Sequence, residues 1–467
     1  MTHPTTAATP QANPALVLFI TMMASFSTPF ILSSINIALP AMAAELGMSA
    51  RVMTWVSIAF LAASGVLLVP MGKLADIYGR RRAFRLGFFV FTAASLLCAL
   101  AESAGWLVFF RFLQGTGSSM VFGTGIAILT SVFPPQRLGR AIGLTVASVY
   151  TGLCAGPVLG GVMVSALGWR SIFFANVLIG VAVLAAMHYG MRGEWRDARN
   201  DTFDLKGTLI YVPSMALLVL GSMTVRSGIG QLQCLAGAAG LLWFGRHELT
   251  AKHPILDVRM MAGNPRLLFA NLAALINYSA TFSIGFLLSL YLQYVKGLGP
   301  REAGLTLLWM PAVMALLSPA AGRISDKRDP GVIASAGMSV CLLGILLFSL
   351  ITADYPQPLI WAGLAVTGFG LALFSAPNTT AVMSAVEPRY YSMASSTLST
   401  MRVAGQMIGM LSVSVIFSFY LGKERLSAAN ADGLIASFRT AMALSAALCA
   451  AGIFASLKRG KRAQNSA

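Results

Sequence analysis

The chain has 467 residues, of which 57% are hydrophobic and 10% charged, and its formal net charge is +17. A soluble domain is typically about 25% charged, so this composition excludes a soluble enzyme, a disordered chain and a coiled coil. An outer-membrane barrel is disfavoured, because its alternating apolar and polar residues average near neutral, whereas the mean hydropathy here is +0.74. The composition therefore predicts an all-α membrane protein with many spans.

Fourteen apolar runs are long enough to cross a bilayer, which takes about 20 residues. Of the basic residues, 23 lie in segments that are cytoplasmic if both termini are, and 8 lie in the opposite loops. Cytoplasmic loops are enriched in Lys and Arg, so we expect a multi-pass protein of the cytoplasmic (inner) membrane with both termini in the cytoplasm. This placement accounts for the positive charge without a nucleic-acid partner. The runs cover approximately residues 15–40, 51–71, 83–101, 106–132, 140–167, 170–191, 205–225, 229–246, 266–293, 302–321, 332–352, 357–381, 392–420 and 434–457.

The sequence repeats itself at a distance of 250 residues: Gly72 and Asp76 recur as Gly322 and Asp326. The same shift places the first five apolar runs on runs nine to thirteen, so the chain reads as six spans, an extra pair and six further spans. Two parallel six-helix halves are an established transporter plan, with the substrate site between them near the bilayer midplane. The expected domains are an N-terminal six-helix bundle (1–191), a linker with an inserted helix pair (192–265) and a C-terminal six-helix bundle (266–467).

The loop at residues 72–82 is the strongest local signal. Its glycines allow a tight turn, and an Asp can cap a helix N-terminus or pair with an Arg. We expect a latch that joins helix ends in one conformation and releases them in another; the alternative is that the arginines only fix the topology. The residues assigned to this conformational switch are Gly72, Asp76, Gly79, Arg80 and Arg81, with Asp326 at the repeated position.

The fourth span contains a charged residue, Arg111, and Gln114 follows three residues later on the same helix face. A charge inside a span costs roughly 2.5–3.5 kcal/mol on insertion scales. We therefore expect Arg111 to face the protein interior or a water-filled cavity. The alternative is a side chain that extends outward from near the end of the span.

The fifth span carries Gly152, Gly156 and Gly160 at a spacing of four residues, together with Pro157. Small residues at this spacing allow helices to pack closely, and a proline bends a helix. A smooth, bent helix at the interface of two halves would serve as a pivot and belongs to the predicted conformational switch. Plain helix packing is the alternative, and it is compatible with a pivot.

These motifs resemble those of the major facilitator superfamily, specifically its 14-span drug:proton antiporter branch. Residues 72–82 match the family's loop motif G-x-L-A-D-x-x-G-R-[RK]-x, residues 111–117 resemble its fourth-span motif, and residues 152–161 match the antiporter motif G-x-x-x-G-P-x-x-G-G. The resemblance covers nearly the whole chain. It implies multidrug efflux: drugs or other amphipathic small molecules would be exported in exchange for protons by alternating access. Further matches to first-span and late-span motifs lie at residues 36–40, 377–378 and 402–409.

One position departs from the branch. Its first-span motif usually has an Asp nine residues before the proline, here Pro40, and this chain has Ile31 at that position. The family's Asp is commonly assigned to proton or cation handling, and none of the 16 carboxylates lies in the middle of a span here. Coupling is therefore expected to use a proton carried on the substrate or a group at the membrane edge. The edge candidates are Glu102, Glu387 and His188.

A few polar residues lie deep in the spans and are candidates for a substrate cavity. By analogy with the family, spans one, four, nine and thirteen border the central cavity, and scattered polar groups in an apolar pocket suit an amphipathic ligand. The alternative for each amide is a hydrogen bond between helices, worth about 0.6 kcal/mol. The predicted cavity residues are Asn36, Arg111, Gln114, Asn277, Tyr278, Asn378, Arg402 and Gln406.

Three functions compete at this point: proton-driven export of amphipathic compounds, transport of a specific anionic or neutral metabolite with different coupling, and membrane enzymology. An enzyme is disfavoured, because the spans hold no acid–base pair and no activated nucleophile, and no Gly-rich phosphate loop that would use ATP is present. The five cysteines lack metal-ligand spacing. We expect no catalytic residue, no cofactor and no metal; the expected partners are the substrate, protons and the bilayer, with the protein a monomer.

Overall fold

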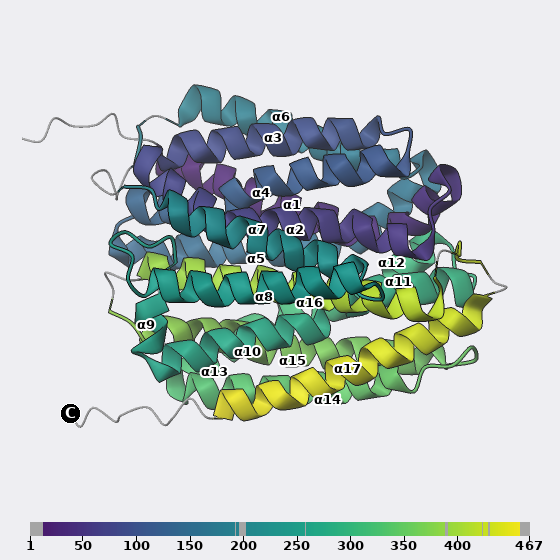
Figure 1. The fold of residues 1–467 in the computed structure, drawn as a ribbon. Helices are drawn as coiled ribbons and strands as arrows, with labels where there is room; N and C mark the ends of the chain where they lie inside the picture. Colours follow the sequence, from purple (N-terminus) through teal and green to yellow (C-terminus); the bar gives the residue numbers. More distant parts are fainter. Residues whose placement is uncertain are drawn as a thin grey trace, which may run out of the picture.

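The computed structural model describes residues 13–191, 193–195, 202–256, 258–387, 391–422, 424–427 and 430–457. Within these ranges the chain is helical and contains no strand (Figure 1). Each of the fourteen predicted apolar runs coincides with one helix or with consecutive helical segments. Several helices continue beyond the apolar run, because their ends lie outside the hydrocarbon and can carry polar side chains.

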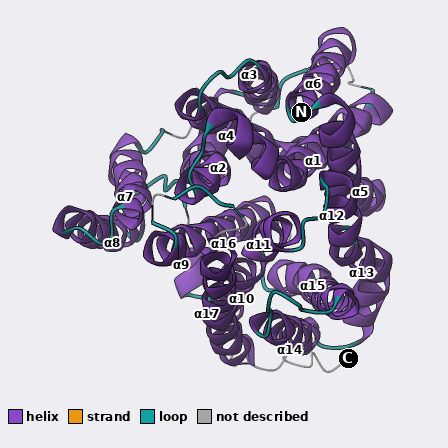
Figure 2. Ribbon diagram, turned by 90° about the vertical axis from the view of Figure 1, so that its right-hand side faces the viewer, coloured by secondary structure: helices purple, strands orange, loops and turns teal. Residues whose placement is uncertain are grey.

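The first six long helices pack into one bundle, at the top of Figure 2. Two of them start at a serine cap: the side chains of Ser49 and Ser103 accept hydrogen bonds from the backbone N–H groups of Val52 and Trp106. The six helices are α1 (Pro14–Leu46), α2 (Ala50–Tyr78), α3 (Arg80–Ala99), α4 (Ala104–Val132), α5 (Pro135–Leu167) and α6 (Arg170–Gly190).

The last six predicted spans form a second bundle, in which two spans are interrupted. The run predicted at 266–293 consists of three segments, and the run predicted at 302–321 consists of two. The second break precedes Pro311, whose ring nitrogen cannot donate the helical hydrogen bond. The elements are α10 (Pro265–Thr281), α11 (Ser283–Leu290), η1 (Tyr291–Val295), α12 (Pro300–Leu307), α13 (Trp309–Lys327), α14 (Pro330–Ser349), α15 (Gln357–Ser384), α16 (Tyr391–Tyr420) and α17 (Ala431–Leu457).

A helix pair lies between the two bundles in sequence and at their side in space: α7 (Leu205–Met223) and α8 (Gly228–Glu248), followed by the short α9 (Val258–Ala262) (Figure 2). The Tyr211 hydroxyl of α7 donates to the carbonyl of Gly65 on α2 at 3.3 Å. Arg226, between α7 and α8, donates to the carbonyl of Ser418 on α16 at 2.9 Å. The pair therefore packs along the seam where α2 of one bundle meets α16 of the other.

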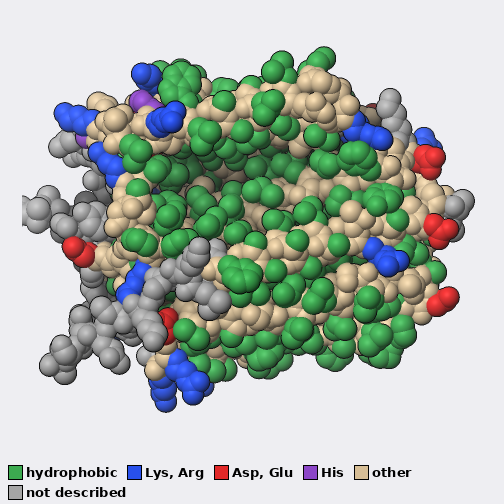
Figure 3. Space-filling model, turned by 60° about the horizontal axis from the view of Figure 1, so that its bottom comes forward, with side chains coloured by type: hydrophobic (Ala, Val, Ile, Leu, Met, Phe, Trp, Pro, Cys, Tyr) green, Lys and Arg blue, Asp and Glu red, His purple; other side chains and the backbone are tan. Residues whose placement is uncertain are grey.

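The fold is that of a multi-pass membrane protein. Among the described residues, thirteen helices are long and apolar enough to cross a membrane. The 21-residue α8 is not one of the thirteen, because glycines, Gln231 and Gln233 dilute its apolar residues. Charged side chains gather at the two ends of the molecule and hydrophobic ones cover the band between them (Figure 3). The count of fourteen spans and the domain boundaries at 191/192 and 265/266 stay predictions.

Candidate transport site

Two ends of the molecule can be distinguished by the course of the chain. We call the end where α1 begins and α17 finishes the terminal end, on the left of Figure 1, and the opposite one the far end. Hydrogen bonds join the halves in the far part of α1: the Ser289 hydroxyl donates to the carbonyl of Asn36 at 2.6 Å, and the Gln293 amide donates to the carbonyl of Ile37 at 3.2 Å. Asn36 therefore lies where the two bundles meet.

Helices α5 and α12 make a second contact between the halves, backbone against backbone. A Cβ on Gly304 of α12 would lie 2.1 Å from the carbonyl oxygen of Pro157, and a Cβ on Gly161 would lie 3.1 Å from the Cα of Arg301. Only hydrogen fits at such separations. Pro157 was predicted as part of the switch, and Gly161 is the last glycine of the motif at residues 152–161. Gly304 was not singled out, because a lone glycine in a span has no distinctive pattern.

The pivot hypothesis needs the glycine stripe of α5 to contact the C-terminal half, but the stripe contacts the N-terminal half. Gly152, Gly156 and Gly160 pack against α1 of the same bundle, and the Ser34 hydroxyl of α1 donates to the carbonyl of Gly156 at 2.9 Å. The stripe thus joins two helices within the N-terminal half. Contact with the other half comes from the neighbouring face of α5.

A polar cluster occupies the middle of the molecule, where helices from both halves approach. The hydroxyl of Tyr150 on α5 donates to the Ser375 hydroxyl on α15 at 3.5 Å, and the Tyr278 hydroxyl of α10 lies 3.4 Å from the same oxygen. The Arg402 guanidinium of α16 lies over the Tyr278 ring, 5.1 Å from its centroid. We call Tyr150, Tyr278, Ser375 and Arg402 the central polar cluster. Three of its members are half-buried and offer donors and aromatic faces to a ligand.

Two predicted cavity residues lie elsewhere. Arg111 and Gln114 are fully buried inside the N-terminal bundle. Arg111 donates to Gln114 and, at 3.0 Å, to the carbonyl of Val56, and its guanidinium lies 4.5 Å from the Phe60 ring centroid. Gln114 in turn donates to Ser95 at 2.6 Å. Arg111 therefore faces the protein interior and connects α4 to α2 and α3; it does not line a cavity in this conformation.

The remaining amides have mixed surroundings. The side chain of Asn378 donates to the carbonyl of Ala270 at 3.3 Å, as expected for an interhelical bond. Asn277 is fully buried, and within the described part of the chain neither of its amide atoms has a hydrogen-bond partner. Gln406 is half-buried one turn after Arg402 on α16. Among the predicted cavity residues that the structure describes, Asn36 contacts the opposite half through Ser289, and Tyr278 and Arg402 lie next to Tyr150 of the opposite half in the central polar cluster.

Residues 72–82, predicted as a loop, are the end of α2 and the start of α3, with only Gly79 between the two helices. They form a hydrogen-bonded junction within the N-terminal half. Arg80 lies 2.8 Å from the Asp76 carboxylate, and it donates to the carbonyl of Ala127 at 3.3 Å and to the Ser131 hydroxyl at 3.1 Å. It thereby connects α2, α3 and α4. Gly79 has φ +126°, a conformation that side chains disfavour. Asp326 lies in α13, but its side chain is outside what the structure describes.

A carboxylate that the sequence did not single out completes this junction. Glu194, after α6, accepts a hydrogen bond from the backbone N–H of Arg81 at 2.9 Å. A negative charge at the first turn of α3 is stabilised by the helix dipole. No spacing rule links position 194 to position 81, so the pairing could not be predicted.

The whole chain can now be compared with known proteins. The sequence profile of the Major Facilitator Superfamily matches residues 17–410. The chain belongs to this superfamily. Among solved structures, this chain is similar to a POT family transporter crystallised with a thioalcohol-conjugated peptide. The TM-score is 0.72, the identity is 14%, and 96% of each chain is covered. At that identity the likeness shows a shared fold.

The facilitator has sequence relatives with different named substrates. It is 29% identical over 442 residues to the riboflavin transporter RibZ of Clostridioides difficile (strain 630), covering 94% of this chain and 96% of that one. It is 30% identical over 397 residues to the multidrug resistance protein Stp of Mycobacterium tuberculosis (strain CDC 1551 / Oshkosh), covering 83% and 73%. The drug efflux pump JefA of the same strain is 29% identical over 395 residues. The chain is thus a transporter by family, with both efflux pumps and a vitamin transporter among its relatives.

The predicted coupling groups of the facilitator all lie at its edges. Glu102, His188 and Glu387 are exposed. Ile31, at the position of the family's usual Asp, is fully buried in the main hydrophobic core. The role of the three edge groups in coupling stays a prediction.

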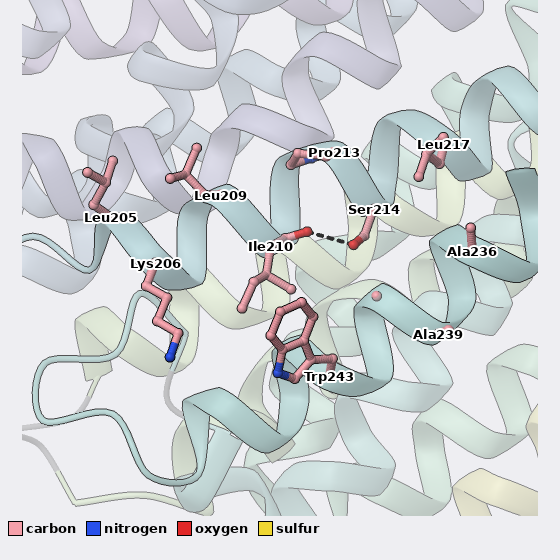
Figure 4. Close-up of a pocket in the computed structure, with 11 residues that line it drawn as sticks. Leu205, Lys206, Leu209, Ile210, Pro213, Ser214, Leu217, Ala236, Ala239 and Trp243 are labelled. Atoms are coloured by element: carbon pink, nitrogen blue, oxygen red, sulfur yellow. Dashed lines mark hydrogen bonds between the residues drawn. The ribbon is translucent and has the colours of Figure 1, made fainter.

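A groove between α7 and α8 lies outside this central region (Figure 4). It is lined mostly by apolar side chains such as Leu209 and Trp243, which are 64% and 59% exposed, with Lys206 near the start of α7. An exposed apolar surface on a membrane helix pair faces lipid. The groove is therefore suited to an acyl chain and has none of the polar groups of the central polar cluster.

Proposed function

We propose that this facilitator is a 14-span secondary active transporter that exports amphipathic small molecules across the cytoplasmic membrane in exchange for protons. The observation that carries the proposal is the central polar cluster, which places donors, two phenol rings and a guanidinium between the two halves. The antiporter motif at residues 152–161 and the drug efflux relatives support export.

Alternating access would be a rocking of one half against the other. The hydrogen bonds described between the halves lie in the far part of α1 and at the central polar cluster. We therefore interpret this conformation as closed at the far end. With the termini in the cytoplasm, substrate would enter from the cytoplasmic side, as an exporter requires. The α5–α12 backbone contact would be the pivot.

The latch at residues 72–82 would act at the terminal end. In this conformation the described bonds of Asp76 and Arg80 lie within their own half. Proton coupling would use a protonated substrate or one of the edge groups Glu102, Glu387 and His188.

Transport of one specific anionic or neutral metabolite is the second candidate. It is favoured by the relative RibZ, a riboflavin transporter aligned over nearly the whole length of both chains. It is also favoured by the stacked pair of Arg402 and Tyr278, because a guanidinium over a ring suits a planar or anionic group. No described carboxylate opposes Arg402 in the central polar cluster.

Reconstitution into proteoliposomes distinguishes these functions. Vesicles with an imposed pH gradient would be tested against riboflavin and a panel of cationic, neutral and anionic amphiphiles. Uptake of several amphiphiles that collapses when the gradient is dissipated supports the exporter. Saturable transport of one compound alone supports the metabolite transporter, and no transport of any compound under either condition contradicts both.

A further inference from the structure

Three ionisable side chains converge at the terminal end of the inserted helix pair. Asp204 precedes α7, while His247 and Glu248 end α8. The His247 Nε2 lies 3.0 Å from the Asp204 Oδ2. One nitrogen or oxygen atom of each residue lies within 4.8 Å of the others. The side chains of Asp204 and His247 are 12% and 17% exposed, and Glu248 is fully buried.

The Glu248 carboxylate is incompletely satisfied. Its Oε2 accepts a hydrogen bond from the backbone N–H of Leu256 at 2.9 Å, whereas its Oε1 is buried and has no donor among the described residues. A buried carboxylate oxygen without a partner costs free energy. This oxygen lies beside a second acid: a Cβ on Gly207 would be 2.7 Å from it and 2.4 Å from the Asp204 Oδ2. Two acidic oxygens at one small gap need either a shared proton or a cation between them.

We propose that Asp204, His247 and Glu248 bind a divalent transition-metal ion, for which Zn²⁺ is the working probe. Imidazole nitrogen and carboxylate oxygen are both ligands of such ions, with metal–ligand distances of about 2.0–2.2 Å. Ligands arranged tetrahedrally at that distance are separated by about 3–4 Å. The His247 and Asp204 atoms are 3.0 Å apart, and all three lie within 4.8 Å of one another. The Gly207 N–H donates to the Asp204 Oδ1 at 2.8 Å, and the Asp204 Oδ2 contacts the His247 Nε2. The ion would replace this direct contact by binding both atoms.

The position of the site gives the ion a structural consequence. Asp204 ends the connection from the N-terminal half, and Leu256, held by Glu248, begins the connection to the C-terminal half. The segment that leads from the N-terminal half into α7 and the segment that leads from α8 to the C-terminal half therefore meet at one small site. A bound ion would tie the start of α7 to the end of α8 and hold these links together while the halves move.

The test uses the full-length protein, purified in detergent on a tag without histidines. After incubation with Zn²⁺ and removal of free ions, elemental analysis is expected to give one zinc per chain, and EDTA is expected to lower the melting temperature. Co²⁺ should bind with visible absorption bands but without the near-ultraviolet thiolate band, which separates this site from the five cysteines. His247→Gln and Glu248→Gln should each weaken binding by at least about tenfold.

Two further variants make the test specific. Gly207→Ala keeps all three ligands but fills the gap with a methyl group, so it should also lose the metal. Asp432→Asn, which removes an exposed acid from the first turn of α17, should bind like the unaltered protein. If the unaltered chain binds no zinc or cobalt, the two acids share a proton and the proposal is wrong. If Gly207→Ala and His247→Gln bind the metal as tightly as the unaltered protein does, the ion lies elsewhere and the proposal is likewise wrong.

Discussion

Tyr150 is the residue that connects the two halves at the middle of the molecule. Its hydroxyl is the only described side-chain donor of the N-terminal half in the central polar cluster, and its partner Ser375 also contacts Tyr278. A hydrogen bond of this kind contributes roughly 0.5–1.5 kcal/mol. If the Tyr150 hydroxyl binds substrate in one conformation and Ser375 in another, it would contribute both to substrate binding and to the contact between the halves.

Removing this hydroxyl should weaken transport without unfolding the protein. We expect Tyr150→Phe to raise KM by about fivefold, the equivalent of one hydrogen bond of about 1 kcal/mol. The measurement is initial transport rate against substrate concentration in proteoliposomes. The matched control is Tyr189→Phe, because Tyr189 is 80% exposed at the end of α6. An unchanged KM in Tyr150→Phe would exclude this hydroxyl from the site.

The Asp76–Arg80 pair predicts a functional and not a stability phenotype. Asp76 is 35% exposed and Arg80 is 2% exposed, so the pair is only partly exposed. An amide oxygen in place of the carboxylate can still accept the hydrogen bond from Arg80, so the cost in stability should stay at about 1 kcal/mol. We therefore expect Asp76→Asn to reach the membrane in normal amounts and to transport several-fold more slowly. Transport rate normalised to the amount of protein in the membrane tests this, with Asp432→Asn as the control. Normal transport by the mutant would leave Asp76 without a role in the latch.

Helix α5 uses two faces for two purposes. One face, the stripe of Gly152, Gly156 and Gly160, packs on α1 within a half, and the other, at Pro157 and Gly161, contacts α12 across the halves. The same helix therefore packs within its own half on one side, and on the other it forms the boundary that would move under the proposed pivot. Substitutions on the two faces should have different consequences.

A methyl group at the moving boundary should disturb the balance of conformations. In Gly304→Ala the new Cβ would lie 2.1 Å from the carbonyl oxygen of Pro157, so the far-end contact must separate. We expect the conformation closed at the far end to be depopulated and transport to fall by tenfold or more. Gly143→Ala, on an open face of α5, should behave normally because nothing lies within 4 Å of its added Cβ. If Gly304→Ala transports as fast as Gly143→Ala, the close packing of α5 on α12 is not needed for transport.

A large side chain on the fixed face should instead destabilise the N-terminal half. In Gly156→Leu the first added carbon alone would lie 1.8 Å from the Ser33 hydroxyl and 2.9 Å from the carbonyl oxygen of Phe30. Overpacking of this kind typically costs 1–3 kcal/mol or more. We expect a lower melting temperature together with lost transport. A melting temperature like that of the unaltered protein would place the stripe in contact with lipid.

At the scale of the whole molecule, we expect charge to select the substrate. The central polar cluster contains Arg402 and no described carboxylate, and Ile31 replaces the acid that the antiporter branch usually has. A dication brought out of water needs an opposing charge. Poor export of dications is therefore expected, with better export of neutral, zwitterionic or anionic amphiphiles. Monovalent lipophilic cations should be intermediate, because the ring of Tyr278 can partly stabilise them.

This prediction can be measured in a host that lacks its own efflux pumps. Resistance to a dication is compared with resistance to a monocation of the same size and hydrophobicity, with an empty vector as the control. Strong dication resistance conferred by the unaltered chain would contradict the prediction and would point to an acid outside the central polar cluster.

The sequence by itself determined the features that depend on local composition. Apolar runs specify membrane helices because no other open structure satisfies backbone hydrogen bonds in lipid, and the motifs at residues 72–82 and 152–161 indicated the superfamily to which the chain belongs. The short-range pair of Asp76 and Arg80 was also predictable, since a helical turn brings such residues together.

Only the tertiary structure decided which distant residues meet. Tyr150 and Ser375 are 225 residues apart, Asp204 and His247 are 43 apart, and no periodicity relates either pair. It also separated Arg111 from the cavity to which its motif was assigned, because its guanidinium has partners inside its own half. Helix formation depends on neighbours along the chain, whereas a site between bundles depends on the rotation and depth of each helix, and these are set by packing across the whole fold.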